Sequence, residues 1–283
     1  MKLMTWNIQW ARGADGRVDP ARIVAEARRI ADFDLLCLQE VSAGYPELPG
    51  SDGADQFAAF AALLPGYAAV EGVAVDTLHP GGGRRRFGNM ILSRLPVLQV
   101  LRHHLPWPAD PGVRSMARLA LEATVDSPFG PLRVTTTHLE YFSARQRLAQ
   151  TLRLRELHRE AVAQARSARP GSAAEGPFEP VPRGLPCVLA GDFNFRPDAP
   201  ERGRLLQPFD DGTPRLHDAW ELRHGDRAHA PTVGLHDKAQ WPGEPFACDF
   251  VFVSEDLAPR VRGLSVDDAS RASDHQPLLL ELG

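Results

Sequence analysis

The chain alternates short apolar runs with clusters of glycine, proline, asparagine and aspartate. Apolar runs of about four to eight residues that are rich in β-branched or aromatic side chains and bounded by turn formers are typical of buried strands. On this basis we predict strands at residues 3–8, 35–38, 90–92, 119–125, 132–137, 187–190, 250–253 and 278–282.

Helical spacing appears in two longer stretches, residues 20–31 and 143–168. Side chains three or four positions apart share one face of a helix. Apolar residues recur with this spacing at Ile23, Ala27 and Ile30 in the first stretch, and at Leu148, Leu152 and Ala161 in the second. Because strands and helices are interspersed along the chain, the predicted fold class is α/β or α+β.

Residues 169–186 follow neither period and are rich in proline and glycine. A stretch of this composition between a helix and a strand is typical of a surface excursion. We therefore expect a mobile loop at residues 169–186.

The composition is that of an ordinary globular protein, with 43% hydrophobic and 24% charged residues in a length of 283. That length lies near the upper limit of one hydrophobic core, so we expect a single domain over residues 1–283. No run of about 18 apolar residues could insert into a membrane, and the first residues lack the apolar stretch of a signal peptide. The expectation is a soluble, cytoplasmic chain whose three cysteines (Cys37, Cys187 and Cys248) are reduced core residues.

The formal net charge of -4 gives no overall electrostatic signature for nucleic acid, although a local basic patch is compatible with it. The chain has two lysines, Lys2 and Lys238, and its other basic residues are arginine. We interpret this arginine bias as compositional. One candidate exception is Arg84 to Arg86, which follow three glycines and could form a cationic loop. A solvated charge run is the alternative.

Polar residues gather where the predicted strands end. Asn7, Glu40, His138, Asp192 and Asn194 follow four different strands, and the pair Asp274 and His275 precedes the last one. Loops at strand ends can converge on a shared cleft while the strands hold them rigid. Taken singly, an asparagine or aspartate at such a position is more often a turn former than a ligand.

Glu40 is the least easily explained as a turn residue. It follows four residues of buried-strand character, and a carboxylate there requires a cation, hydrogen bonds or a raised pKa. Mg²⁺ suits it, because this ion takes oxygen ligands and commonly uses one or two carboxylates together with substrate phosphate. No cysteine and histidine spacing indicates a structural zinc site.

Seven segments occur in an order that resembles the motifs of the endonuclease/exonuclease/phosphatase family. They are Thr-Trp-Asn at 5–7, Gln-Glu-Val at 39–41, Gly-Asn-Met-Ile-Leu-Ser-Arg at 88–94, Thr-His-Leu at 137–139, Gly-Asp-Phe-Asn at 191–194, Asp249 and Ser-Asp-His-Gln-Pro at 273–277. The match covers nearly the whole chain. The resemblance implies a DNase-I-like four-layer α/β/β/α sandwich of two packed mixed sheets flanked by helices.

The resemblance also implies residue roles. Glu40 would be the main metal ligand, with Asn7 and Asp274 near the ion, and the metal would be Mg²⁺ or Mn²⁺. Asp192 and Asn194 would surround the attacking water and the phosphate, and Asp249 would orient His275. The phosphate-binding residues would be His138, Asn194, Asn89 and Arg118. Whether Asp192 or His275 deprotonates the water stays open.

These residue types suit metal-assisted hydrolysis of a phosphoester, which needs an oriented water and positive charge around phosphorus. We expect a phosphodiesterase or nuclease, with nucleic acid ahead of a small-molecule or lipid phosphoester. A phosphatase and a non-catalytic binding module on the same fold are the alternatives. No motif indicates a protein partner.

Three departures from family patterns bear on this expectation. Val41-Ser42 and Thr137-His138-Leu139 differ from the lysine and the asparagine-tyrosine-proline motif of abasic-site endonucleases, which disfavours that substrate. Ala247-Cys248 replaces the usual lead-in to Asp249. The register of the strand at Asp249 is therefore less securely predicted than the aspartate itself.

Overall fold

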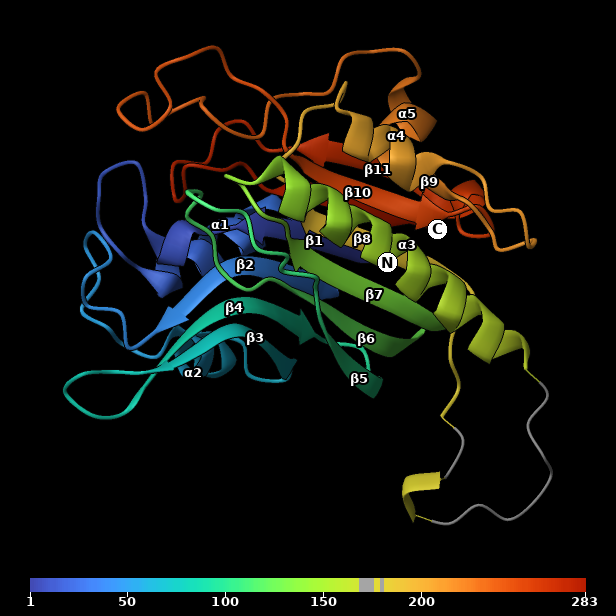
Figure 1. The fold of residues 1–283 in the computed structure, drawn as a ribbon, viewed down its shortest axis with the longest axis horizontal. Coiled ribbons are helices and arrows are strands. Elements are labelled where there is room, and N and C mark those ends of the chain that lie inside the picture. Colours follow the sequence, from blue (N-terminus) through green and yellow to red (C-terminus); the bar gives the residue numbers. More distant parts are fainter. Residues whose placement is uncertain (168–175, 179–180) are drawn as a thin grey trace.

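The structure is a computed structural model that describes residues 1–167, 176–178 and 181–283. Two six-stranded sheets form its centre (Figure 1). The first sheet has the order β11-β12-β1-β2-β4-β3, with β1 (Lys2–Asn7), β2 (Leu35–Ala43), β3 (Ala68–Leu78), β4 (Arg84–Ser93), β11 (Val261–Val266) and β12 (Leu278–Leu282). The second has the order β5-β6-β7-β8-β10-β9, with β5 (Val97–His104), β6 (Leu119–Ser127), β7 (Gly130–His138), β8 (Cys187–Asp192), β9 (Leu216–Asp218) and β10 (Asp249–Ser254).

Each of the eight predicted strands is present, and the four that the hydrophobic pattern missed are β3, β5, β9 and β11. These four are the edge strands of the two sheets. Edge strands are often partly exposed, and β3, β5 and β11 accordingly mix exposed with more buried positions. The fourth, β9, has three residues and is too short to give an apolar run. A continuous apolar run is the signal of a strand buried on both faces, so the pattern found the inner strands and not the edges.

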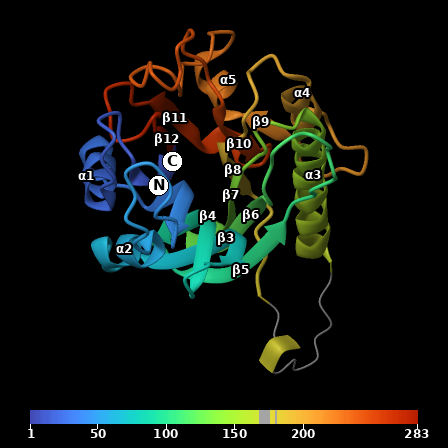
Figure 2. The same cartoon turned by 60° about the vertical axis from the view of Figure 1, so that its left-hand side comes forward.

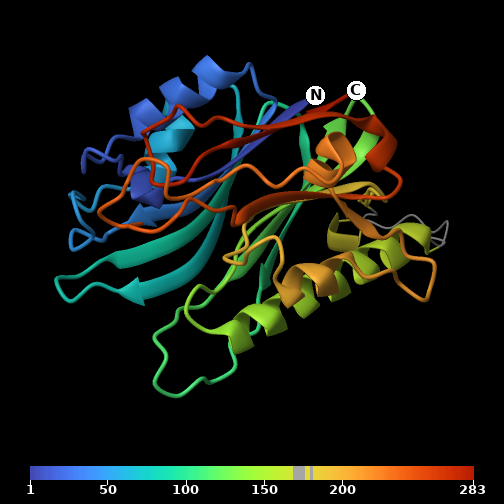
Figure 3. The same ribbon diagram turned by 90° about the horizontal axis from the view of Figure 1, so that it is seen from above.

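Helices cover the outer face of each sheet. The helices α1 (Pro20–Ile30) and α2 (Gln56–Leu63) lie on one side, and α3 (Ala144–Arg166) and α4 (Pro200–Leu206) lie on the other (Figure 2). Figure 3 shows the same layers from above. A short helix, α5 (Ala219–His224), contacts β10 and β11, and 3₁₀ turns occur at Gln9–Ala11, Gly176–Phe178 and Ala258–Arg260. The expected four-layer α/β/β/α sandwich is confirmed.

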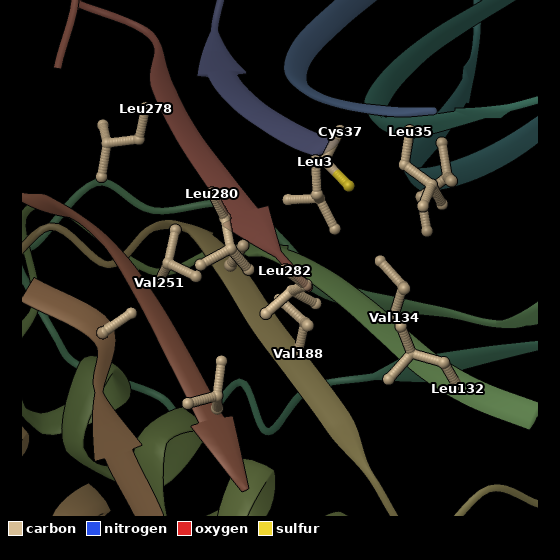
Figure 4. Packing of buried hydrophobic residues seen from close by; sticks show 14 of the residues in the cluster. Leu3, Leu35, Cys37, Leu132, Val134, Val188, Val251, Leu278, Leu280 and Leu282 are labelled. Atoms are coloured by element: carbon tan, nitrogen blue, oxygen red, sulfur yellow. The ribbon is translucent and has the colours of Figure 1, made fainter. Parts of the chain in front are cut away.

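Successive residues of the inner strands enter different cores because their side chains alternate across the sheet. Leu3, Cys37 and Val188 lie in the core between the two sheets (Figure 4). Their neighbours Met4 and Leu189 lie under the helices on the outer faces. This double burial explains the apolar character of these segments.

The apolar residues whose spacing indicated the second helix do not all face the core. Leu148 and Leu152 are 39% and 43% exposed, whereas Gln146 and Gln150 are buried. These two glutamines bond backbone groups of the neighbouring loops, as in the hydrogen bond from Gln146 Nε2 to the Pro108 carbonyl (2.9 Å). The amino-terminal half of α3 therefore covers loops, where amides satisfy buried backbone groups better than leucines.

Part of the expected loop at 169–186 lies outside the described residues, and its mobility stays a prediction. In its described part, the Gly184 carbonyl accepts a hydrogen bond from Arg133 Nε (2.7 Å). Among the residues that the structure describes, no helix combines the length and the apolar character needed to cross a membrane.

Sheet topology brings the polar strand ends to one edge of the sandwich. The pairs β1–β2 and β7–β8 are parallel, so their carboxyl ends share a direction, and β12 runs antiparallel to β1 and starts at that same edge. Ser273 Oγ donates to the Asn7 carbonyl (2.7 Å), and Trp6 Nε1 donates to the His275 carbonyl (2.9 Å). These two hydrogen bonds hold the first motif (residues 5–7) next to the last one (residues 273–277).

Candidate active site

Glu40 lies within β2, not after it, at an irregularity of the strand. Pairing with β4 shifts register between Leu38 and Val41, and Glu40 has a left-handed backbone with φ of 62°. A bulge of this kind redirects a side chain, and a non-glycine residue in this region costs about 1–3 kcal/mol. The bulge takes Glu40 out of the regular alternation of β2, and its side chain lines a cavity at the edge of the sandwich.

Asn7, at the end of β1, bridges two carboxylates. Its Nδ2 donates to Glu40 Oε1 (3.1 Å) and to Asp192 Oδ2 (2.9 Å), and its Oδ1 accepts from the backbone N–H of Gln9 (3.1 Å). Asn7 therefore presents N–H groups to the carboxylates and holds Glu40 close to Asp192. Direct ligation of a metal by Asn7 stays a prediction.

Three adjacent strands place His138, Asp192 and Asp249 in one row. Asp192 on β8 is in register with His138 on β7 and with Asp249 on β10. Gly191 permits this arrangement: its φ is 142°, and a Cβ atom there would lie 2.0 Å from the Thr137 carbonyl oxygen. Only glycine allows β8 to approach β7 so closely, which sets the position of Asp192.

His275 is held through its Nδ1 atom, which lies 2.9 Å from Asp249 Oδ2. The same carboxylate oxygen accepts a hydrogen bond from Thr232 Oγ1 (2.6 Å), and Cys248 Sγ lies 3.5 Å away. The other nitrogen of the ring, Nε2, lies 3.9 Å from Asp192 Oδ2. The predicted pairing of Asp249 with His275 is thus present in the geometry, and Cys248 lies against this pair as well as in the core.

Asp274 is bound by residues that the sequence did not single out. Its Oδ2 accepts hydrogen bonds from Gln9 Nε2 (3.1 Å), Gln240 Nε2 (2.8 Å) and Trp241 Nε1 (3.0 Å). Gln240 and Trp241 belong to an irregular segment between α5 and β10. That segment has no periodic pattern. The feature in its sequence that points to a role at a site is Trp241, an aromatic residue within a polar loop.

The remaining two predicted residues of this edge are His138 and Asn194. His138 Nε2 lies 3.4 Å from Asp192 Oδ2 and 3.9 Å from Glu40 Oε1. Asn194 has a left-handed backbone, its N–H donates to Asp192 Oδ1 (2.9 Å), and its Nδ2 donates to the Leu139 carbonyl (2.9 Å). Asn194 thereby fixes the turn that carries the Asp192 carboxylate.

These side chains line one cavity of about 720 Å³. The volume lies within the range typical of small-molecule sites. The polar residues at the level of the strand ends are Glu40, His138, Asp192, Asn194, Asp274 and His275. Asn7 and Asp249 lie behind them, where they orient Glu40, Asp192 and His275.

The family model described as "Endonuclease/Exonuclease/phosphatase family" matches residues 4–275. The chain belongs to the endonuclease/exonuclease/phosphatase family. Members of this family hydrolyse phosphoester bonds and generally require a divalent metal, and the chain is an enzyme of that class. No curated protein sequence matches it.

Solved structures of this family share the fold. An endonuclease/exonuclease/phosphatase from Beutenbergia cavernae is 28% identical, with a TM-score of 0.67 over 100% of this chain and 72% of that one. A 3′ phosphatase from Neisseria bound to a product DNA hairpin is 21% identical (TM-score 0.63; 100% and 99% covered). A mannosyl-6-phosphatase from Bacteroides thetaiotaomicron is 16% identical (TM-score 0.60; 100% and 99% covered).

In the cavity of this endonuclease/exonuclease/phosphatase family member, the carboxylates lie close together and disfavour one another's ionisation. Burial, reinforced by the charges of Asp274 and Asp192, raises the pKa of Glu40 to about 7. Burial and the charge of Asp249 raise the pKa of Asp192 to about 6. A divalent cation would relieve this repulsion, and the donors of Glu40 and Asp274 are carboxylate oxygens, the type that Mg²⁺ and Mn²⁺ take. The residues present therefore fit a hard divalent cation.

The two histidines are in opposite electrostatic environments. Burial, together with the charge of Arg118, lowers the pKa of His138 well below its ordinary value. Burial alone would also lower the pKa of His275, but the charges of Asp249 and Asp274 raise it well above that value. His138 is accordingly suited to a neutral hydrogen-bonding role, and His275 to carrying a proton at neutral pH.

Arg118, one of the predicted phosphate-binding residues, lines the cavity with an unsatisfied donor. The side chain is buried, its Nε donates to Glu140 Oε2 (3.2 Å), and its NH1 atom has no hydrogen-bond partner among the described residues. A buried N–H donor without a partner costs free energy unless an acceptor binds there. A phosphate oxygen is an acceptor of suitable charge.

The structure does not bring Asn89 to the cavity wall. Its side chain is buried on β4, and Nδ2 donates to the Leu119 carbonyl of the facing sheet (3.0 Å). Phosphate binding by Asn89 stays a prediction. The contact that the structure shows is a link between the two sheets.

The arginines of the β3–β4 hairpin, Arg84 to Arg86, are paired with acidic groups. Arg84 pairs with Asp76, Arg85 with Glu47, and Arg86 with both Asp55 and Glu71. Their charge is therefore largely compensated within the chain. The hairpin matches the alternative interpretation, a solvated and paired charge run, better than a free cationic loop.

Proposed function

We propose that this chain, acting as a single domain, is a Mg²⁺- or Mn²⁺-dependent phosphodiesterase, which uses water to break one P–O ester bond and releases an alcohol and a phosphomonoester. The observation that carries the proposal is the convergence of Glu40, Asp274, Asp192 and His275 on one cavity from both sheets. A metal held by Glu40 and Asp274 would stabilise negative charge on the phosphate. Asn7 and the donors to Asp274 keep these two carboxylates in place before substrate arrives.

The two candidate groups for proton transfer are Asp192 and His275, with 3.9 Å between Asp192 Oδ2 and His275 Nε2. Asp249 fixes the His275 ring through Nδ1, so that Nε2 is the nitrogen available for proton transfer. On the phosphate side, Arg118 NH1 and His138 Nε2 offer hydrogen-bonding nitrogens. Preorganised donors of this kind stabilise charge that develops in the transition state.

The charges around the cavity support a small phosphoester as the substrate more than a nucleic acid polymer. The lining contains four carboxylates, Glu40, Glu140, Asp192 and Asp274, but two arginines, Arg114 and Arg118. A polymer is bound chiefly through several lysine or arginine contacts to its phosphates. The paired arginines of the hairpin add little to this supply. The cavity therefore suits a ligand with one or two phosphate groups.

Hydrolysis assays with and without chelator test the proposal. The panel contains a chromogenic phosphodiester, a phosphomonoester, single- and double-stranded DNA, and RNA. We expect metal-dependent hydrolysis of the small phosphodiester, and a loss of about 100-fold or more in Glu40→Gln because the principal ligand charge is removed. Glu71→Gln makes the same change at a carboxylate outside the cavity, where it pairs with Arg86, and is the matched control.

Three outcomes have different meanings. A folded protein that hydrolyses none of these substrates in either metal would refute the phosphodiesterase proposal and favour a non-catalytic binding module. Full activity of Glu40→Gln would contradict the metal assignment. Hydrolysis of the nucleic acids alone would overturn the preference for a small substrate and restore the polymer as the substrate.

A further inference from the structure

Aromatic side chains from two segments form one wall of the cavity. Tyr141 and Phe142 follow β7, and Trp241 comes from the segment between α5 and β10. Tyr141 contacts Phe142 edge to face at 4.8 Å between ring centroids, and Trp241 at 6.2 Å. Trp241 in turn meets the His275 ring at 6.3 Å. A continuous series of rings therefore leads from the rim of the cavity to His275.

A cation completes this aromatic wall at the rim. The guanidinium carbon of Arg114 lies 4.2 Å from the centroid of the Phe142 ring. Within the part of the chain that the structure describes, Arg114 forms no ion pair. Its charge is thus available to a ligand, and a guanidinium group over an aromatic face is itself a surface on which planar rings stack.

The wall is held in place although its rings are open to solvent. Arg147 NH1 donates to the Tyr141 carbonyl (3.0 Å), and the Phe142 N–H donates to Glu140 Oε1 (2.9 Å). Trp241 is fixed through its bond to Asp274. Tyr141 and Phe142 nevertheless remain 46% and 47% exposed. Their rings contribute little core burial, whereas a rigid exposed ring loses little entropy when a ligand covers it.

We propose that Tyr141, Phe142 and Arg114 bind a planar ring carried by the substrate next to its phosphate group. The inference rests on the proposed function, because the phosphate position is set by the metal-binding and phosphate-binding residues of the same cavity. The substrate class is then a small phosphoester with an aromatic substituent, such as a nucleobase. Stacking on aromatic side chains is tolerant of ring identity, so this wall selects for a ring and not for one base.

The test compares two inhibitors that differ by the ring alone. Adenosine 5′-monophosphate and ribose 5-phosphate are titrated against hydrolysis of a chromogenic phosphodiester in Mg²⁺. The wild-type protein is expected to bind the adenosine compound about tenfold more tightly, since stacking on one aromatic side chain contributes on this scale. The double variant Tyr141→Leu with Phe142→Leu keeps apolar volume and removes the rings, and is expected to bring the ratio of the two inhibition constants close to one.

Two further variants separate stacking from a general structural effect. Tyr141→Phe retains the ring and should retain the ratio. Phe209→Leu removes a ring that stacks under Arg155 at 4.1 Å outside the cavity, and should also leave the ratio unchanged. Near-equal inhibition by the two compounds in the wild type would overturn the proposal. So would a ratio that survives in the double variant.

Calorimetric titration with the same two compounds separates this inference from the proposed function. If no phosphodiester is hydrolysed but the adenosine compound still binds more tightly than ribose 5-phosphate, the ring site stands and the phosphodiesterase proposal fails. If hydrolysis occurs and both compounds bind equally, the ring site alone fails. A single-stranded oligonucleotide that binds about tenfold more tightly than the mononucleotide would overturn the assignment to a small substrate, because a polymer gains affinity from its further phosphates.

Discussion

Replacing Asp249 by asparagine tests whether the buried pair with His275 supports the reaction. Both side chains are buried, and Asp249 Oδ2 accepts from Thr232 Oγ1 at 2.6 Å and lies 2.9 Å from His275 Nδ1. The second oxygen, Oδ1, is buried and has no hydrogen-bond partner among the residues that the structure describes. Asparagine cannot satisfy this arrangement, because one orientation buries an unpaired NH₂ group and the other turns that group toward Nδ1 and imposes the wrong tautomer.

The size of the effect follows from the bond that is lost. A hydrogen bond to a charged group contributes about 1.5–3 kcal/mol, and general acid–base catalysis contributes about 10²–10⁴-fold. We therefore expect kcat of Asp249→Asn to fall by about 100-fold at saturating Mg²⁺, with a smaller change in metal affinity. The charge of Asp249 raises the pKa of His275, so its removal lowers that pKa. The limb of the pH profile that reports His275 should move to lower pH.

Steady-state kinetics on a chromogenic phosphodiester across pH measure both effects. Near-ultraviolet circular dichroism and thermal unfolding establish that the variant is folded. Thr232→Val removes the hydroxyl group but leaves the Asp249–His275 contact, and should lose less than about tenfold. If folded Asp249→Asn retains kcat within about threefold of the wild type, with an unchanged pH profile, the reasoning about this pair is refuted.

Three further predictions concern stability and the surroundings of the site. Asp218→Asn should lower the free energy of unfolding by about 2 kcal/mol in urea denaturation, since it removes the buried carboxylate that pairs with the half-buried Arg202 and His229. Arg202 keeps its second partner, Glu221. Burial alone would raise the pKa of Asp218 in the folded state, but His229 and Arg202 lower it. The contribution of the Asp218 carboxylate to stability is therefore present above the unfolded pKa of about 3.9 and is lost as the pH falls below that value. A difference in stability between the variant and the wild type that persists in strong acid would contradict this pH dependence. Gly191→Ala should lose most activity and some stability, because its Cβ would lie 2.0 Å from the Thr137 carbonyl oxygen; normal kinetics in this variant would show that Asp192 tolerates displacement. Alanine at all three hairpin arginines should change hydrolysis of single-stranded DNA by less than about threefold at any salt concentration, and a reduced salt dependence would instead identify them as phosphate contacts.

The sequence alone determined the inner strands and the polar residues at their ends. An inner strand is covered on both faces, so its apolar run is continuous and the first polar residue after it is conspicuous. The run Leu35 to Leu38 before Gln39 and Glu40, and the run Cys187 to Ala190 before Asp192, are examples. The spacing and order of these motifs were also sufficient to indicate the family, and the match over residues 4–275 confirms it.

Tertiary structure decided what lies between the motifs. The hydrogen bonds of Gln9, Gln240 and Trp241 to Asp274 join segments more than 30 residues apart in the sequence, and no local pattern encodes such contacts. The strained position of Glu40 depends on a shift in pairing with β4, which is a property of two strands together. Periodicity describes how one segment meets its surroundings, whereas these contacts depend on which segments meet.

The sequence and the tertiary structure differ most in what they indicate about charge at the site. In the sequence, the hairpin arginines are a positive cluster beside a phosphate motif. In the structure, Arg86 faces Asp55 and Glu71, which come from other parts of the chain, while Arg114, an inconspicuous single residue, stacks on Phe142 beside the cavity. The net field at a site depends on distances between charges. The sequence therefore determined the reaction chemistry of this protein, and only the fold decided which charges and rings a substrate meets.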